Sequence, residues 1–189
     1  MSAGAPIGML LRRLAAAPVV FAVGETGLAG FVTPSDLNKQ PVRVHFYLLL
    51  ADLEMTMASV ARETLDDPRV AVNFLSPRRR AKALGQWNAS RKENIDADVL
   101  TAFQFSDLVS LVGKAALHGR FGQPTKTKWL RATSGLTRFR DQVMHPTSDF
   151  LGTRTIEELI GTEERLRAML LAVSGSDAPP TVKEEARAQ

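Results

Sequence analysis

Three residues near the end of the chain combine a fixed positive charge with a group that exchanges protons near neutral pH. They are Arg140, Asp141 and His145, in the string Arg-Asp-Gln-Val-Met-His-Pro. A guanidinium stays charged and holds a phosphate in a planar fork, whereas a histidine has an ordinary pKa of about 6.5. These groups suffice to cleave RNA without a metal. The 2′-hydroxyl attacks the adjacent phosphorus, and the protein supplies proton transfer and a cation for the phosphorane.

The spacing of these residues limits how they can act together. Five residues on an ideal helix turn through about 500°, or roughly 140° around the axis, so Arg140 and His145 share a face only if the helix stops. Pro146 predicts a stop at His145, because the residue before a proline is disfavoured in the helical conformation. A separate acid and base would need a second histidine, which a two-fold homodimer supplies. The structural alternative is that Arg140 and Asp141 form surface ion pairs and His145 lies at a helix C-terminus.

The composition leaves few other catalytic classes open. The chain has 189 residues, no cysteine and three histidines, which excludes disulfides, thiolate metal sites, thiol nucleophiles and haem attachment. It lacks an HExxH zinc motif, a phosphate-binding glycine loop and a GxSxG elbow. We therefore expect no metal site and no required cofactor.

Positive charge is concentrated in two windows, although the net charge is only +4. From Ser76 to Lys92 there are six cations and no acid, and from Lys114 to Ser148 there are seven cations against Asp141 alone. Such segregation is typical of a surface that binds a polyanion, and the alternative is a solvated basic face with no ligand. The candidate RNA-binding residues are Arg78, Arg79, Arg80, Lys82, Lys126, Lys128, Arg131 and Arg138.

Hydrophobic spacing predicts a mainly α protein, in which a small α-β-β unit precedes an antiparallel bundle of about four main helices. A capping box of Thr155 and Glu158 marks the start of the last helix, and 174–189 lacks an apolar period and is predicted to be disordered. The expected elements are a helix at 7–14, strands at 19–23 and 28–32, helices at 41–65, 76–95 and up to 118, a basic connector, a short helix after 134 and the last helix from 155.

The string from Arg140 to His145 resembles the Arg-x4-His signature of HEPN domains, which are small helical bundles. The resemblance covers about residues 41–173 and includes the polar second position, Asp141. It implies a metal-independent endoribonuclease that acts as a homodimer, with Arg140, Asp141 and His145 as its active residues. It also implies a role in stress response or defence, with an antitoxin or another regulatory partner.

The string Gly30-Phe-Val-Thr33-Pro-Ser-Asp36 resembles part of a CBS domain, whose pattern is Gly-h-x-Thr-x-x-Asp. The resemblance implies that Gly30, Thr33 and Asp36 bind a regulatory adenine nucleotide such as AMP or ATP. The threonine hydroxyl would contact a phosphate and the carboxylate would accept from ribose hydroxyls. In the alternative interpretation, Thr33 and Asp36 cap the following helix and the hairpin serves as a dimer or docking surface.

These observations predict three segments: a partial CBS-like unit at 1–40, a HEPN-like bundle at 41–173 and a tail at 174–189. No uninterrupted apolar run approaches the roughly 18 to 20 residues of a membrane span, and Arg12 and Arg13 interrupt the N-terminal apolar stretch. The leading hypothesis is a cytoplasmic endoribonuclease whose N-terminal unit either senses an adenine nucleotide or joins two subunits. The alternatives are a catalytically silent nucleic-acid-binding bundle and a nucleotide-responsive interaction module.

Overall fold

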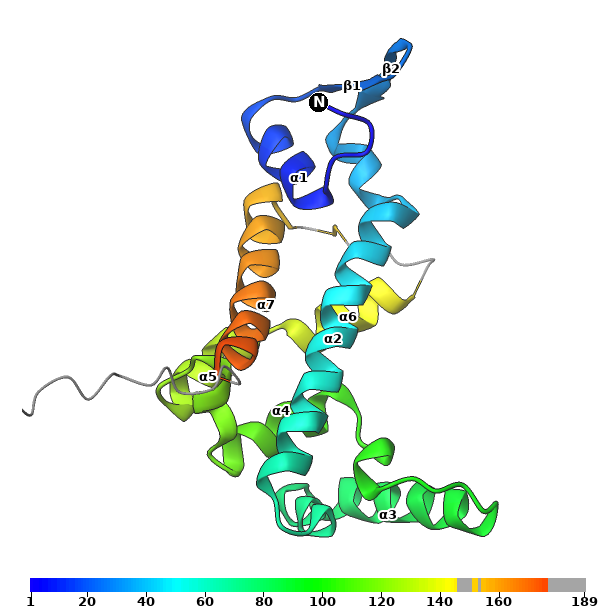
Figure 1. Ribbon diagram of the computed structural model, residues 1–189, viewed down its shortest axis with the longest axis vertical. Coiled ribbons are helices and arrows are strands. Elements are labelled where there is room, and N and C mark those ends of the chain that lie inside the picture. The colour runs from blue at the N-terminus through cyan, green and yellow to red at the C-terminus, as the bar shows by residue number, and fades with distance from the viewer. Residues whose placement is uncertain (146–150, 153, 177–189) are drawn as a thin grey trace, which may run out of the picture.

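The protein is mainly helical, as its hydrophobic spacing predicts (Figure 1). A computed structural model describes residues 1–145, 151–152 and 154–176. Within these residues lie one two-stranded antiparallel sheet and seven α-helices. The elements are α1 (Ile7–Ala16), β1 (Val20–Gly24), β2 (Gly27–Val32), α2 (Gln40–Thr64), α3 (Pro77–Lys92), α4 (Phe105–Lys114), α5 (Lys126–Thr133), α6 (Leu136–Met144) and α7 (Ile156–Ser176).

The long helix α2 is the axis of the molecule, and α4, α6 and α7 all pack against it. One stripe of α2 is buried at helical spacing and forms the centre of the core. Its rings meet those of α6, since the centroids of Phe46 and Phe139 are 5.1 Å apart in an edge-on arrangement. The buried residues of α2 are Val42, Phe46, Leu49, Leu50, Leu53, Met57, Ala58, Val60 and Ala61.

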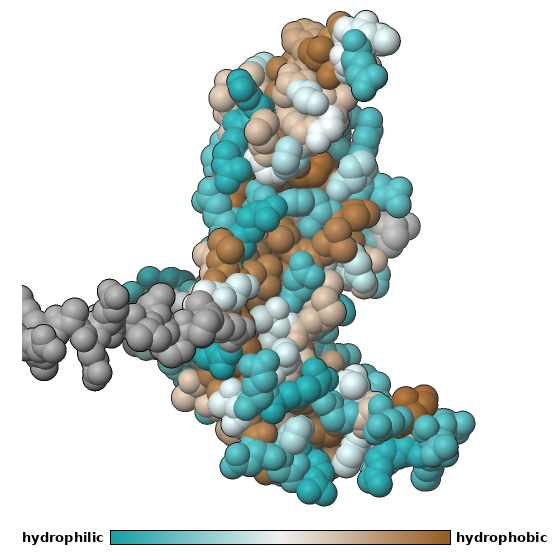
Figure 2. Space-filling view, in the orientation of Figure 1, coloured by the Kyte–Doolittle hydropathy of each residue, from teal (hydrophilic) through white to brown (hydrophobic). Residues whose placement is uncertain are grey.

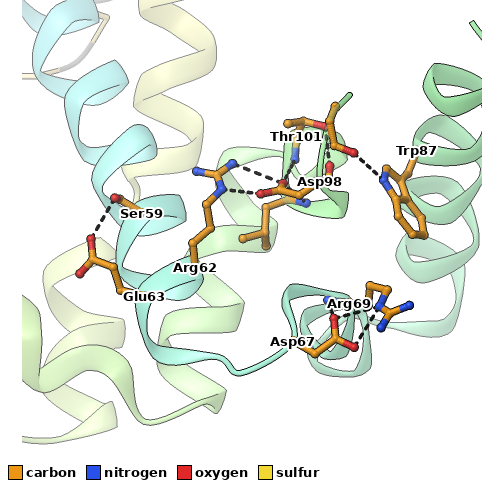
Figure 3. Close-up of polar contacts among 10 residues, drawn as sticks. Ser59, Arg62, Glu63, Asp67, Arg69, Trp87, Asp98 and Thr101 are labelled. Atoms are coloured by element: carbon orange, nitrogen blue, oxygen red, sulfur yellow. Dashed lines mark hydrogen bonds and ion pairs between the residues drawn. The ribbon is translucent and has the colours of Figure 1, made fainter. Parts of the chain in front are cut away.

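The basic helix α3 lies apart from the other helices, at one end of the molecule (Figure 1). It is joined to the rest through short 3-10 turns at Pro68–Phe74 and Val99–Ala102. Polar contacts fix these turns (Figure 3): Arg62 of α2 pairs with Asp98, and the indole N–H of Trp87 donates to the carbonyl of Ala97 at 2.8 Å. Because α3 is attached at one end of the molecule, it does not run alongside the other helices as a member of the predicted antiparallel bundle.

The N-terminal α-β-β unit is present as predicted. The strands pair in register from Val20 with Val32 to Gly24 with Gly27, with a bulge between Ala22 and Val23. Helix α1 packs against α7 and buries Leu11 and Leu14. The unit therefore rests on the bundle through α1, whereas one face of the hairpin stays exposed.

Three boundaries differ from the sequence predictions. The basic connector contains a helix, α5, because Thr125 accepts a hydrogen bond from the Lys128 amide at 3.2 Å and Trp129 anchors the helix in the core. The third predicted helix ends at Lys114, since Ala116 takes a left-handed conformation with φ 58°. Helix α7 continues through residues 174–176 of the predicted tail, and the remainder of that tail lies outside the described residues.

Helix α2 is long and apolar enough by composition alone to cross a membrane, although 39% of its most apolar window is buried inside the protein. The sequence shows no uninterrupted apolar run of that length. The high hydropathy arises because α2 carries apolar side chains on more than one face.

Candidate nucleic-acid interface

Helix α6 carries the residues that sequence analysis placed at the centre of the site. Leu136, Phe139 and Val143 are buried at helical spacing and hold the helix against the core. Gly135, with φ 76°, starts the helix and has no side chain to cap its first amides. The helix ends at Met144 because His145 is extended, with φ −97° and ψ 103°, directly before Pro146. The predicted stop is therefore confirmed.

Arg140 faces α2 and is held by two acids. Its guanidinium lies 3.8 Å from the carboxylate of Glu54 and 3.5 Å from that of Asp141. Burial raises the pKa of Glu54, and the charge of Arg140 opposes that rise. A phosphate that reached Arg140 would compete with these carboxylates.

His145 lies at the exposed end of α6, where its backbone is fixed by α2. The guanidinium of Arg43 donates to the carbonyls of Gln142 at 2.9 Å and His145 at 3.2 Å, so it caps the C-terminus of α6. The structure therefore brings Arg140 and Asp141 together at 3.5 Å. Among the described residues it gives no direct contact between Arg140 and the imidazole of His145.

A cavity of about 960 Å³ lies between α6 and the first half of α7. We call it the α6–α7 groove. The N-terminus of α6 opens into the groove at Gly135 and Leu136, and the residues that line it include three arginines, Arg138, Arg154 and Arg165. Unpaired helix amides and arginine forks are the groups that proteins use to hold phosphates.

The groove is lined by three arginines and two carboxylates, and several of these side chains have partners within the protein. The guanidinium of Arg165 donates to the carbonyl of Gly161 at 3.3 Å and to the hydroxyl of Thr162 at 3.2 Å. Of the two lining carboxylates, Glu158 accepts from the Thr155 amide at 3.0 Å and Glu164 pairs with Arg12 at 3.2 Å.

The Arg154 guanidinium lies 4.9 Å from the ring centroid of Phe139. Burial and the charge of Arg138 lower the pKa of Arg154, and the charge of Glu158 opposes that shift. Arg154 is thus close enough to both Arg138 and Glu158 for their charges to interact.

Three further predicted cations extend this surface along α5. Lys126, Lys128 and Arg131 are all exposed, and only Ser134 and Gly135 separate α5 from α6. In the chain, the exposed cations of α5 are therefore followed directly by Arg138 of α6, whereas Arg154 and Arg165 of the groove come from a later segment.

The basic window of α3 divides into structural and exposed residues. Arg79 makes a bidentate ion pair with the buried carboxylate of Asp107, and this contact raises its pKa. Arg80 donates to the carbonyl of Val72 at 3.0 Å. Only Arg78 and Lys82 of the four predicted residues are exposed, so Arg79 and Arg80 serve mainly to attach α3.

The predicted nucleotide-binding residues form a local cap. The Asp36 carboxylate accepts from the amide of Thr33 at 2.8 Å and its hydroxyl at 2.9 Å. The hydrogen bond from Lys39, followed by those from Thr33, lowers the pKa of Asp36 to about 2. Gly30 lies in β2, opposite Ala22. The Thr33 hydroxyl thus already donates its hydrogen bond to Asp36. This is the arrangement that the capping interpretation predicts.

The other two histidines and the buried tryptophan, which also have chemistry that could serve RNA binding, have structural partners. Trp129 is fully buried and donates to the carbonyl of Val109 at 2.9 Å, so it presents no ring for stacking on a base. His118 contacts the carbonyl of Gln123 at 2.8 Å. His45 lies 3.2 Å from the buried carboxylate of Glu163. Burial lowers the pKa of His45, and Glu163 opposes that shift.

Sequence reasoning missed Arg154 and Arg165. Arg154 lies just before α7 and Arg165 near the middle of that helix, both after the second basic window ends at Ser148, and acids interrupt the charge around them. The signal that could have found them is the capping box at Thr155, which marks where α7 starts. Both α6 and α7 pack on α2, and this packing brings their arginines to one groove. Among the described residues, no group of three or more acids and histidines is placed to hold a metal ion.

Comparison with known proteins identifies no relative. No family model, curated protein sequence or solved structure matches the chain.

Proposed function

We propose that the protein binds RNA along α5 and the α6–α7 groove. The observation that carries the proposal is the convergence of Arg138, Arg154 and Arg165 on a cavity into which the uncapped N-terminus of α6 opens. Arginine forks and helix amides are groups that recognise phosphate oxygens.

A polymer of phosphates suits this surface better than a single small anion does. The exposed cations of α5 lead along the chain to the groove. A track of this kind can contact successive phosphates and release the counterions condensed on them. Exposed Arg78 and Lys82 lie on α3, at the end of the molecule, so we assign them at most a secondary contact with a long strand.

The test is fluorescence anisotropy with a short labelled single-stranded RNA at several salt concentrations. The double variant Arg138→Ala/Arg165→Ala should bind RNA more weakly, because it loses two phosphate contacts. Each lost contact should also reduce the slope of log K against log salt by about 1. The matched control is Arg13→Ala, which removes an exposed arginine from α1. Unchanged binding by the double variant, or equal losses in both proteins, would contradict the proposal. A DNA strand of the same sequence tests whether the 2′-hydroxyl matters.

Cleavage of the bound RNA is the second candidate function. It is favoured by the exposure of Asp141 and His145 and by the ion pair that joins Asp141 to Arg140 at 3.5 Å. In this mechanism His145 transfers the proton and Arg140 leaves Glu54 to bind the scissile phosphate. RNA incubated in EDTA with the wild-type protein should be cut, and His145→Ala should cut it at least a hundredfold more slowly. Equal cleavage by both proteins would remove the catalytic assignment while leaving the binding proposal intact.

A further inference from the structure

Helix α2 has a second apolar stripe on the side that faces away from the core. Val44, Leu48, Ala51 and Met55 follow one another at steps of four, three and four residues. This spacing is that of the a and d positions of a coiled coil, where every third or fourth residue returns to one seam. The buried residues Phe46, Leu53 and Val60 take the opposite position of the same repeat. We call the outer stripe the α2 seam.

The α2 seam is exposed. The exposed fractions are 44% for Val44, 54% for Leu48 and 63% for Met55. Tyr47 and Met144 of α6 flank the seam and are 42% and 41% exposed. Figure 2 shows apolar surface over the middle of the molecule, where α2 and α7 lie. Isolated exposed apolar residues are ordinary on a protein surface, but a continuous helical row indicates an interaction site.

The size of this surface fits a protein partner. The five exposed apolar side chains, Val44, Tyr47, Leu48, Met55 and Met144, form a patch on the order of a few hundred Å², a size at which apolar patches are often functional. One partner of a standard interface buries about 800 Å², of which about 57% is apolar, so a patch of this order supplies much of the apolar part of such an interface. Polar residues, among them Asp52 and Glu54, border the seam as a rim, and Arg140 pairs with Glu54.

The seam is complementary to itself when two copies run antiparallel. If the two-fold axis passes between residues 48 and 51, Leu48 meets the small Ala51 of the other copy, and Val44 meets the long Met55. Each layer then combines a larger side chain with a smaller one, which lets facing layers interdigitate. The seam spans 12 residues, 44–55, or about 17 Å of helix. An isologous contact of this kind closes on itself and gives a dimer.

We infer that the α2 seam packs antiparallel against the α2 seam of a second copy of this chain, so that the protein is a two-fold dimer. The same apolar stripe accounts for the high hydropathy of α2, since the helix is buried on one face by its own core and on the other by the partner copy. The inference rests on the seam alone and does not depend on RNA binding.

The first test measures the mass of the full chain in solution by analytical ultracentrifugation. The wild-type protein should be a dimer, and Leu48→Asp should raise the dimer dissociation constant by about a hundredfold or more, because a charge replaces a central apolar contact. The matched control is Leu28→Asp on β2, where the side chain is 70% exposed. Since both positions are exposed, circular dichroism should show that both variants fold. A monomeric wild type, or a dimer lost in Leu28→Asp and kept in Leu48→Asp, would overturn the inference.

The second test reads the orientation of the helices by disulfide formation. The chain has no cysteine, so introduced cysteines report only their own positions. Val44→Cys/Met55→Cys should cross-link two copies upon oxidation, whereas Val44→Cys and Met55→Cys alone should not, because an antiparallel seam separates equal residues at its ends. Cross-linking of either single variant would indicate a parallel contact. Flotation of the wild type with lipid vesicles, lost in Leu48→Asp, would instead place the seam against a membrane.

Discussion

Gly8 lies where α1 meets the buried carboxylate of Glu163 on α7. A Cβ atom at this position would be too close to both carboxylate oxygens to be accommodated without movement. The carboxylate cannot move freely, because its Oε1 accepts from Arg167 at 2.9 Å and lies 3.2 Å from His45. Glycine therefore occupies position 8, within α1, because no larger side chain fits beside Glu163.

Gly8→Ala should lower the free energy of unfolding by about 1 to 3 kcal/mol, the range of overpacking in a core. The matched control is Gly85→Ala in α3, where nothing lies within 4 Å of the added atom. That variant should gain about 0.5 to 1 kcal/mol, because alanine is the better helix former. Urea denaturation of the two variants measures both values. A Gly8→Ala protein as stable as the wild type would show that the contact with Glu163 relaxes freely.

Asp36 gives the cap at Thr33 a defined pH dependence. Its pKa is lowered to about 2 in the folded chain, first by the hydrogen bond with Lys39 and then by those with Thr33. The folded state thus binds the proton less tightly than the unfolded state, so the stabilisation is complete above the unfolded pKa and is lost as the pH falls toward 2.

Asp36→Asn should therefore lower the melting temperature at pH 7, and its difference from the wild type should shrink as the pH falls from 4 to about 2. Thermal melts at a series of pH values measure this difference. A gap that stays constant down to pH 2 would mean that the charge of Asp36 contributes nothing to the cap.

At the scale of elements, an ion pair joins α3 to α4. The side chain of Asp107 is 5% exposed, receives the guanidinium of Arg79, and accepts from the Gln104 amide at 2.9 Å. The carboxylate therefore holds two elements at once, and its loss would leave Arg79 partly buried without this counter-charge.

Asp107→Ala should lower the free energy of unfolding by about 2 to 3 kcal/mol, because breaking a buried pair strands the remaining charge. Lys82→Ala, an exposed change on the same helix, should stay within about 0.5 kcal/mol of the wild type. Urea denaturation again gives the values. Equal stability of all three proteins would contradict the structural role of Arg79.

At the scale of the whole molecule, the two proposed surfaces use different parts of α6. Arg138 and Gln142 line the α6–α7 groove, whereas Arg140 and Met144 lie toward α2 and its outer face. Sites that share no partners act independently.

Leu48→Asp should therefore bind a short RNA, long enough for one groove only, with the affinity of the wild type, even though the variant is monomeric. Conversely, Arg138→Ala/Arg165→Ala should remain a dimer. Anisotropy and ultracentrifugation of both variants check the pair of outcomes. A large loss of RNA affinity in Leu48→Asp would show that the binding surface is shared between two copies.

The sequence by itself determined the elements that depend on local interactions. The core stripe of α2, the capping box at Thr155 and the stop of α6 before Pro146 all follow from contacts within a few residues. The missed helix α5 shows the limit of this reasoning, since its one large anchor, Trp129, is buried by α4 and the residues around it.

Only the tertiary structure decided which charged side chains are exposed to a ligand and which are bound within the protein. Arg79 and Arg78 are neighbours in one basic window, yet Arg79 is bound to Asp107 and Arg78 is exposed. Arg138 and Arg165 are far apart in sequence, yet they line one cavity. Local spacing determines which face of a helix is apolar, because a helix has 3.6 residues per turn and residues three or four apart therefore lie on the same face. Which charges meet depends on how helices distant in the chain pack together, and no local pattern records that packing.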